Sequence, residues 1–178
     1  IDAGKLYGFS PQHVLDIQQS LYEKKLTTYP RSDCEYLPEN QLSDIGSILN
    51  NIKSISDELY TLVQRAGIKI RSRAWNDKKI TAHHAIIPTT VKPDFAKLSS
   101  DEKKMYTLIA RAYLAQFYPA KTFLTTTILT EATGEVFKTT GTVIQELGWK
   151  KLYKHDDEND AEEDVSLPSV KEGESVQF

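Results

Sequence analysis

The 178-residue sequence is poor in the residues on which several protein classes depend. Its single cysteine, Cys34, excludes an internal disulfide framework and is typical of a reducing compartment. No run of about 18 apolar residues occurs, so we expect no membrane span. The sequence also has no initiator methionine, basic n-region or apolar h-region, so we expect no signal peptide and a cytoplasmic protein.

The composition that remains is that of a soluble globular protein, with 39% apolar and 26% charged residues. The charge is uneven, because residues 1–121 hold 17 Lys and Arg against 13 Asp and Glu, whereas residues 122–178 hold 5 against 12. The small positive surplus permits an anionic partner without by itself indicating nucleic acid. The acidic run DDENDAEED at 156–164 is typical of a solvated loop.

Helical signals dominate the first two thirds of the chain. The first helix is predicted from Pro11 to about Leu26, with Ser10 as its N-cap. Three more helices are predicted from Pro38 or Glu39 to about Ile52, from Ser56 to Arg65, and from Ser99 or Ser100 to Pro119. Gly67 suits a left-handed cap at the end of the predicted helix from Ser56 to Arg65.

Strand signals lie elsewhere in the chain. Residues 68–98 lack a helical period and predict short strands and loops. From Lys121 onward, Thr, Val, Ile and Phe around a turn at Gly134 predict a two-stranded hairpin, and LPSVKEGESVQF begins another strand pattern. We therefore expect an α+β chain with a helical domain at 1–121 and part of a β-rich neighbouring domain at 122–178, excised from a larger protein.

The segment LTTYPRSDCEYLP, residues 26–38, permits phosphate chemistry. Pro30 favours extended backbone at Tyr29, and side chains two positions apart on extended backbone share one side. Tyr29 and Arg31 would then reach one phosphodiester, with the phenol oxygen as nucleophile and the guanidinium binding the non-bridging oxygens. The alternative is that Tyr29 is a half-buried aromatic and Arg31 a surface charge.

A second segment, WNDKKITAHHAIIPT at 75–89, contains two adjacent histidines. A histidine near a phosphate can donate a hydrogen bond or relay a proton, and on extended backbone only one of His83 and His84 would reach a site. Adjacent histidines lack the spacing of metal ligands, so no metal site is expected here. Nearby basic residues permit contact with a nucleic-acid backbone, although a solvated loop explains them equally: Arg71, Arg73, Lys78, Lys79.

Taken together, these segments resemble the bacterial type IA DNA topoisomerases, in the form typical of topoisomerase III. LYEKKLTTYPRSDCEYLP resembles the active-site tyrosine segment, and AWNDKKITAHHAIIPT resembles the histidine segment downstream of it. The flanking segments GFSPQHVLDIQQSLYEKKL, LIARAYLAQFYPAKTFLTTTI and GTVIQELGWKKLY also match, in order. The resemblance implies a winged-helix-like (CAP-like) domain that carries the tyrosine, followed by part of the β-rich gate domain.

The resemblance also implies the chemistry. Tyr29 would attack single-stranded DNA and form a 5′-phosphotyrosine, another strand would pass through the gap, and religation would need no ATP. Arg31 and His83 would be the other catalytic residues. DNA contacts would come from these two and from further residues: Lys25, Arg71, Arg73, Lys78, Lys79, His84. Mg²⁺ would be bound by a Toprim domain that we do not find in this sequence, so we expect no cofactor on this chain.

From the same resemblance we expect the partners to be single-stranded DNA and the remaining domains of the same polypeptide. A monomeric, nucleoid-associated protein is expected, and the chain alone should be inactive. Two alternatives are a non-catalytic winged-helix DNA-binding module and an interaction domain without a DNA role. The first predicts a recognition helix rich in polar and basic side chains, and the second predicts that Tyr29 and Arg31 lie apart or buried.

Overall fold

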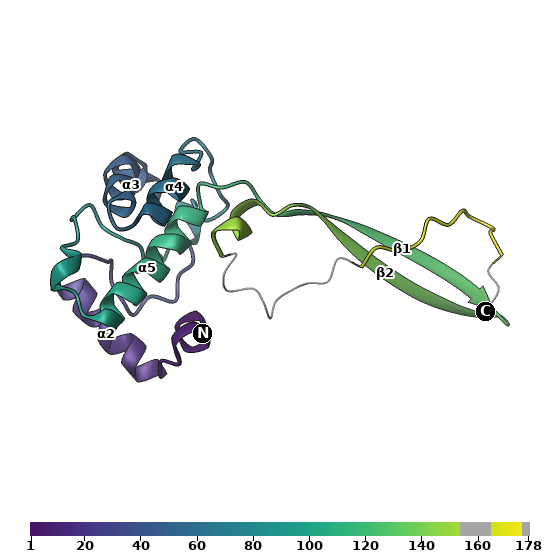
Figure 1. Ribbon diagram of the computed structural model, residues 1–178, viewed down its shortest axis with the longest axis horizontal. Helices are drawn as coiled ribbons and strands as arrows, with labels where there is room; N and C mark the ends of the chain where they lie inside the picture. Colours follow the sequence, from purple (N-terminus) through teal and green to yellow (C-terminus); the bar gives the residue numbers. More distant parts are fainter. Residues whose placement is uncertain (154–164, 176–178) are drawn as a thin grey trace. The chain divides into compact units, whose positions relative to one another are not determined.

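A computed structural model describes residues 1–153 and 165–175 of the chain (Figure 1). The chain forms two compact units, Ile1–Pro119 and Ala120–Phe178. The first unit is helical and the second contains an antiparallel hairpin, so the α+β prediction is confirmed. The acidic run at 156–164 lies outside the described residues.

Serine N-caps begin three of the five α-helices of the first unit. α1 spans Asp2–Tyr7, α2 spans Pro11–Glu23, α3 spans Ile45–Lys53, α4 spans Asp57–Gln64 and α5 spans Ser100–Ala115. The Ser10 side chain accepts the N–H of His13 at the start of α2, and Ser99 forms a capping box with Glu102 at the start of α5. The N-terminal ends predicted for α2 and α5 are therefore confirmed.

Several predicted boundaries are wrong. α2 ends at Glu23 rather than near Leu26, and the second predicted helix begins as a 3-10 helix, Glu39–Asp44, that leads into α3. Gly67 is not a left-handed cap, because α4 ends on right-handed Arg65. The N–H of Gly67 instead donates to the carbonyl of Phe117 (2.8 Å), so a long-range contact fixes this turn.

The expected strands within 68–98 do not form. The segment contains the 3-10 helices Asp77–Lys79 and Phe95–Lys97, and its strand-like pairing is limited to two isolated bridges. The first unit, which is described throughout, has no two-stranded wing, so its winged-helix assignment remains a prediction.

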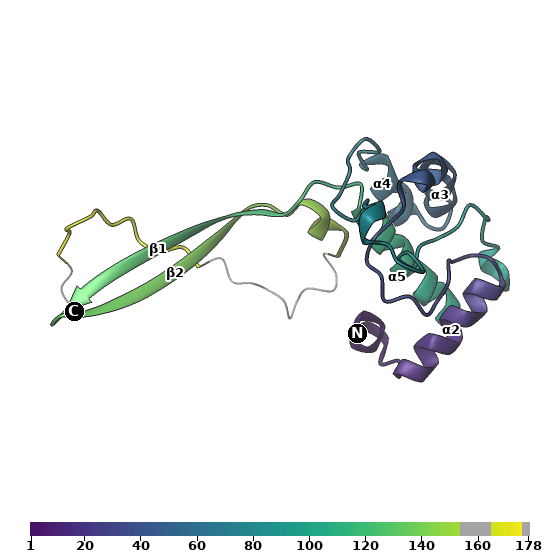
Figure 2. The ribbon, with the colours of Figure 1, turned by 180° about the vertical axis from the view of Figure 1, so that it is seen from behind.

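α2 and α5 pack against each other in the first unit, as both views show (Figures 1 and 2). The core of the first unit includes Leu21 of α2 and Tyr106 and Leu114 of α5, none of which is exposed to solvent. Burying a leucine side chain of this kind stabilises the fold by about 1.5–3 kcal/mol.

A polar cluster also joins these two helices. The buried carboxylate of Glu102 accepts hydrogen bonds from the Ser20 hydroxyl (2.7 Å), from the Lys24 ammonium and from the Ser99 backbone. Burial alone would raise the pKa of Glu102, but these donors outweigh it and lower the pKa to about 2. Near the helix starts, His13 and Asp101 make a second contact at 2.9 Å.

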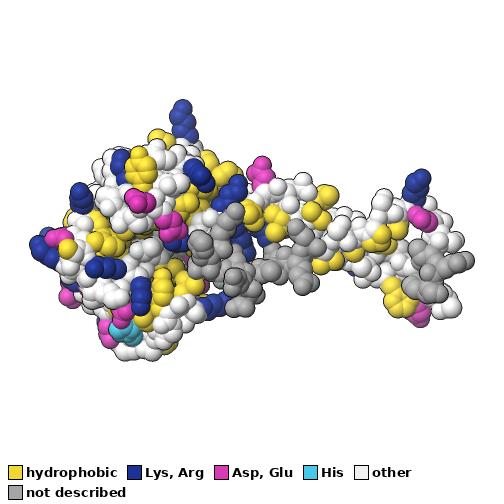
Figure 3. Space-filling view, in the orientation of Figure 1, with side chains coloured by type: hydrophobic (Ala, Val, Ile, Leu, Met, Phe, Trp, Pro, Cys, Tyr) yellow, Lys and Arg dark blue, Asp and Glu magenta, His cyan; other side chains and the backbone are white. Residues whose placement is uncertain are grey.

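The second unit contains the predicted hairpin, formed by β1 (Thr122–Ala132) and β2 (Glu135–Glu146) and followed by the 3-10 helix Gly148–Tyr153. Thr133 and Gly134 both have positive φ, as a two-residue hairpin turn with a primed geometry requires. The hairpin exposes large apolar side chains along its length (Figure 3): Phe123, Leu124, Leu129, Val136, Phe137.

Residues 165–175 do not form the strand that LPSVKEGESVQF predicts. This segment lies close to β2 at Gly141, where a Cβ atom would approach the carbonyl oxygen of Val165 to 2.4 Å and Cγ of Leu167 to 2.6 Å. Glycine is therefore required at this position for the two segments to lie so close together.

Candidate active site

The end of α2 directs the chain into the tyrosine segment. Lys25 adopts left-handed backbone (φ 61°), its N–H donates to Tyr22 (2.8 Å), and the N–H of Leu26 donates to Leu21 (2.9 Å). This pair of bonds is the Schellman arrangement that closes helices, usually with glycine at the left-handed position. Leu21 and Leu26 are both buried, so the turn is also fixed by apolar packing.

The residues just before Tyr29 are paired with the histidine segment. Thr28 donates its N–H to Ile87 (3.0 Å), and its hydroxyl accepts the N–H of Ile87 in return (3.0 Å). Thr89 donates its N–H to the carbonyl of Leu26 (3.0 Å). This bond and the Thr28–Ile87 bond flank an antiparallel bridge between Thr27 and Pro88. Tyr29 therefore follows directly on a segment held by several long-range hydrogen bonds.

The residues after Tyr29 return to the same partner segment. Leu37 donates to Ala74 (2.7 Å) and accepts from Asn76 (3.0 Å), and Ala85 donates to Tyr36 (2.9 Å). We call residues 29–36 the tyrosine loop. Because residues 74–89 hold the loop on both sides, the position of Tyr29 relative to the histidine segment is fixed by tertiary pairing.

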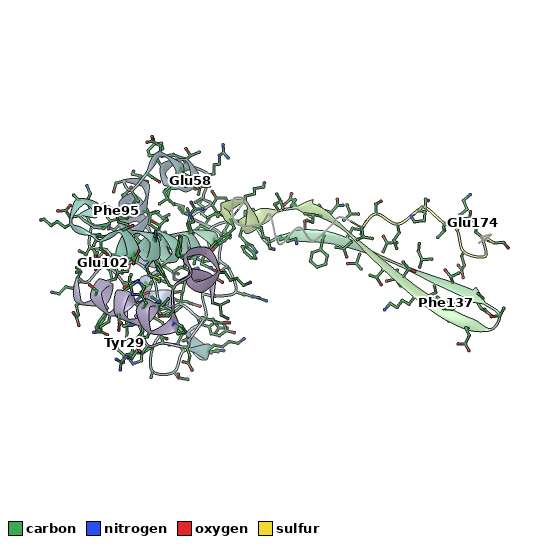
Figure 4. All side chains as sticks on the ribbon, turned by 60° about the horizontal axis from the view of Figure 1, so that its bottom comes forward. Tyr29, Glu58, Phe95, Glu102, Phe137 and Glu174 are labelled. Atoms are coloured by element: carbon green, nitrogen blue, oxygen red, sulfur yellow. The ribbon has the colours of Figure 1, made fainter. Side chains whose placement is uncertain are left out.

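Tyr29, which is labelled in Figure 4, packs against two aromatic rings. The His83 imidazole lies against its phenol ring, with centroids 4.3 Å apart and planes tilted by 32°, and Tyr22 of α2 packs edge-on at 5.7 Å and 84°. Tyr29 is half-buried, and its hydroxyl has no hydrogen-bond partner among the described residues. The aromatic contacts therefore hold the phenol ring of Tyr29, and its hydroxyl oxygen is available to a substrate.

Arg31 is exposed, and its guanidinium forms no ion pair with any residue that the structure describes. The extended backbone predicted across residues 29–31 is not observed, because Pro30 and Arg31 lie in a turn. Residues 29–31 therefore lack the strand geometry that would place the Tyr29 and Arg31 side chains on one side. Tyr29 is half-buried and Arg31 is exposed, which is also what the alternative of a half-buried aromatic beside a surface charge expects.

The two adjacent histidines have different contacts. His83 is exposed and lies against Tyr29, whereas both ring nitrogens of half-buried His84 are engaged within the protein. Nδ1 of His84 lies 2.8 Å from the Ala85 carbonyl, so it carries the proton, and Nε2 then accepts from the Gln41 amide (3.0 Å). His84 thus fixes the segment that presents His83.

The basic residues predicted to contact DNA have different surroundings. Lys25, Arg73 and Lys78 are exposed. The Lys79 ammonium donates to the Tyr36 hydroxyl (3.0 Å), so it stabilises the tyrosine loop. Nη1 of Arg71 donates to the carbonyls of Ile68 and Ile70, at 2.8 and 3.0 Å.

Sequence reasoning missed Tyr22, Tyr36 and the threonine pairing as parts of this site. The one available signal was Thr27-Thr28 before Tyr29, because β-branched residues favour strand-like backbone. Within the described residues no group of three or more His, Cys, Asp or Glu side chains could hold a metal ion. No helix among the described residues is long and apolar enough to cross a membrane.

Comparison with known proteins bears on the origin of this arrangement. The family model described as DNA topoisomerase matches residues 1–178. Curated relatives called DNA topoisomerase 3 are 47% identical in Vibrio cholerae over 90% of the chain, and 42% identical in Haemophilus influenzae over 97%. A relative of the same name in Bacillus subtilis is 36% identical over 98% of the chain. The chain spans about a quarter of the length of these relatives.

Proposed function

The chain belongs to the bacterial type IA DNA topoisomerase family, in its topoisomerase III branch, and we propose that it carries the nucleophile of a strand-cleaving enzyme. The observation that supports this best is the packing of the His83 ring against Tyr29, which begins a loop anchored at both ends. The parent polypeptide, which includes the remaining domains, would cleave single-stranded DNA, let another strand pass through the gap and reseal it.

In the proposed step the phenol oxygen of Tyr29 attacks the phosphorus of a DNA phosphodiester. A tyrosine O–P bond forms, the bond from phosphorus to the 3′ oxygen breaks, and that oxygen leaves as a 3′-hydroxyl after gaining a proton. The phenol gives up its proton, and the downstream fragment stays attached to Tyr29 through its 5′ phosphate, as a 5′-phosphotyrosine. Because one phosphodiester is exchanged for another, the reverse step reseals the strand without ATP.

Arg31 and His83 would assist the phosphate in this step. An exposed guanidinium without an internal ion pair is able to bind two non-bridging oxygens at once and to offset the charge that builds up on them. The exposed imidazole of His83 lies against the phenol ring of Tyr29. An N–H of this imidazole is therefore available to a phosphate near the Tyr29 oxygen.

The resemblance implies that Mg²⁺ acts with these residues in the parent enzyme, with its ligands in a Toprim domain. The described residues offer no group of three or more His, Cys, Asp or Glu side chains that could hold the ion. The winged-helix ancestry of the first unit, the monomeric state and the cytoplasmic, nucleoid-associated location belong to the same proposal.

The non-catalytic winged-helix module is a weaker explanation. A helix that reads DNA would be expected to carry basic as well as polar residues, yet α2 has neither Lys nor Arg within Pro11–Glu23. That module would also give no reason for the aromatic contacts on both sides of Tyr29.

The covalent intermediate provides the test. The parent polypeptide is mixed with a single-stranded oligonucleotide labelled at either its 3′ or its 5′ end, and the reaction is stopped with denaturant. We expect the 3′ label, but not the 5′ label, to become attached to the protein, and Tyr29→Phe to abolish the attachment. A labelled adduct that survives Tyr29→Phe would remove Tyr29 from the proposed role.

The chain by itself is expected to be inactive, because the resemblance places the metal-binding half in another domain. Incubation of residues 1–178 with supercoiled plasmid and Mg²⁺ should leave the plasmid supercoiled. Relaxation by this chain that disappears in Tyr29→Phe would contradict the expectation and leave the nucleophile assignment intact.

A further inference from the structure

The chain between Glu58 and Asp77 carries positive charge without any acidic residue. Its basic residues are all exposed: Arg65, Lys69, Arg71, Arg73. We call residues 65–73 the basic loop. Its four cations form no ion pair with the residues described at 1–153 and 165–175, so their charge is not cancelled by these residues. Lys and Arg side chains project over much of the visible face of the helical unit (Figure 3).

The carboxylates that border this stretch are already occupied. Glu58 accepts two hydrogen bonds from Arg111, both at 2.7 Å, and Asp77 accepts the backbone N–H of Glu39 at 2.9 Å. Because these acids are engaged with their own partners, they reduce the positive potential of the basic loop less than free carboxylates would.

The basic loop is held in one conformation by contacts with the end of α5. Gly67 donates its N–H to Phe117 (2.8 Å), and the Ser72 hydroxyl donates to Gln116 (2.7 Å). A Cβ atom at Gly67 would approach Cδ1 of Ile70 to 2.8 Å, so the turn is closely packed. The two carbonyl contacts of Arg71 orient its guanidinium as well. A basic surface that is already ordered loses less conformational entropy when it binds an anion.

The basic loop leads directly to the tyrosine loop. The carbonyl of Ala74, the residue after the basic loop, accepts the N–H of Leu37, the residue after the tyrosine loop. Trp75 and Leu37 also form a parallel bridge. The two loops therefore share one backbone junction, and Ile68, 58% exposed, adds an apolar surface that a base can contact.

We propose that the basic loop is a second binding site for single-stranded DNA, which holds the backbone of the strand beyond the nucleotides at Tyr29. Arg65, Lys69 and Arg73 contact the phosphates of this outer part of the strand. The inference rests on the proposed function, because it takes the bound strand to be the one that Tyr29 cleaves. It differs from that function in predicting that affinity depends on strand length.

Two oligonucleotide lengths separate the two sites. Binding of the whole chain to fluorescent oligothymidylates of about 6 and about 20 nucleotides is measured by anisotropy over a range of salt concentrations. The test variant is Arg65→Gln/Lys69→Gln/Arg73→Gln, and the matched control removes three other exposed charges by Lys5→Gln/Lys92→Gln/Lys97→Gln. Thermal unfolding by circular dichroism verifies that each variant is folded, and Arg73→Gln alone replaces the triple variant if it is not.

We expect the triple variant to bind the long strand about tenfold or more weakly at low salt, with the slope of log K against log salt reduced by about 2. Affinity for the short strand, and both affinities of the control variant, should stay within about twofold of the original. Equal losses for both lengths, no loss for either, or equal losses in the control would overturn the proposal. Equal competition by a duplex of the same length would overturn the assignment to single-stranded DNA.

The adduct experiment under Proposed function is independent of this one. If Tyr29 forms no adduct while the length-dependent loss is observed, the cleavage function fails and the basic loop remains a binding site. If the adduct forms and strand length has no influence on the triple variant, only the second binding site fails.

Discussion

The imidazole of His83 lies against the phenol ring of Tyr29, with ring centroids 4.3 Å apart, although the two residues come from separate segments of the chain. The pairing of Thr27 and Thr28 with residues 85–89 brings them together. The contact has two possible purposes, since the imidazole supports the ring by packing and also offers an N–H to a phosphate. A substitution that keeps the ring and removes the nitrogens separates these purposes.

His83→Phe is expected to keep the packing against Tyr29 and to lose the hydrogen bond to the substrate. If His83 assists the chemistry, the rate of covalent adduct formation by the parent polypeptide should fall about 10²-fold or more, with DNA affinity nearly unchanged. The rate is measured in single-turnover experiments across a range of pH. An unchanged rate would reduce His83 to a packing role.

Arg31→Lys is expected to retain the positive charge and to lose bidentate contact with the phosphate. Since charge-assisted hydrogen bonds are worth about 1.5–3 kcal/mol, the adduct rate should fall about 10- to 100-fold. The arginine is exposed, so the unfolding temperature should not change. Lys92→Arg, an exchange that also conserves charge at an exposed position outside the predicted DNA contacts, is the control. Equal activity of Arg31→Lys and the original protein would contradict a bidentate role.

Glu102→Gln is expected to destabilise the first unit by about 1.5–3 kcal/mol near neutral pH, because it removes the charged acceptor of Ser20 and Lys24. The pKa of Glu102 is lowered from its ordinary 4.5 to about 2, so this stability is fully present above about pH 4.5 and is lost as the pH falls toward 2.

Urea unfolding of the original chain and Glu102→Gln should therefore differ most at neutral pH and converge in acid. Glu58→Gln, which breaks a half-exposed pair with Arg111, should cost less than about 1 kcal/mol. A difference that does not shrink in acid would show that the buried carboxylate does not act through its charge.

Lys25→Gly is expected to stabilise the end of α2 by about 0.5–1 kcal/mol, because Lys25 occupies left-handed backbone that glycine adopts without strain. Lys25→Ala removes the same charge without relieving the backbone, and it serves as the control. If Lys25 contacts DNA as predicted, both variants should lose affinity while only Lys25→Gly gains stability. A loss of stability in Lys25→Gly would mean that the lysine side chain itself holds the turn.

Local signals in the sequence were sufficient for the elements that depend on a few neighbouring residues. Ser10 with Pro11 marked the start of α2, Ser99 with Glu102 marked the start of α5, and Gly134 marked the hairpin turn. Each of these features is a hydrogen bond or a φ preference within one turn of backbone. Gly67 was assigned wrongly because its conformation depends on Phe117, which no local pattern reveals.

The sequence by itself determined the helical and hairpin segments, the family, and the choice of Tyr29, Arg31 and His83 as candidates. Only the tertiary structure decided that His83 contacts Tyr29, whereas His84 is hydrogen-bonded to Gln41. It also decided that Tyr22 packs against the Tyr29 ring and that the Lys79 ammonium donates to the Tyr36 hydroxyl. Caps and turns act over one helical turn, whereas these contacts require residues 26–37 and 74–89 to be closed against each other. That closure depends on packing throughout the unit.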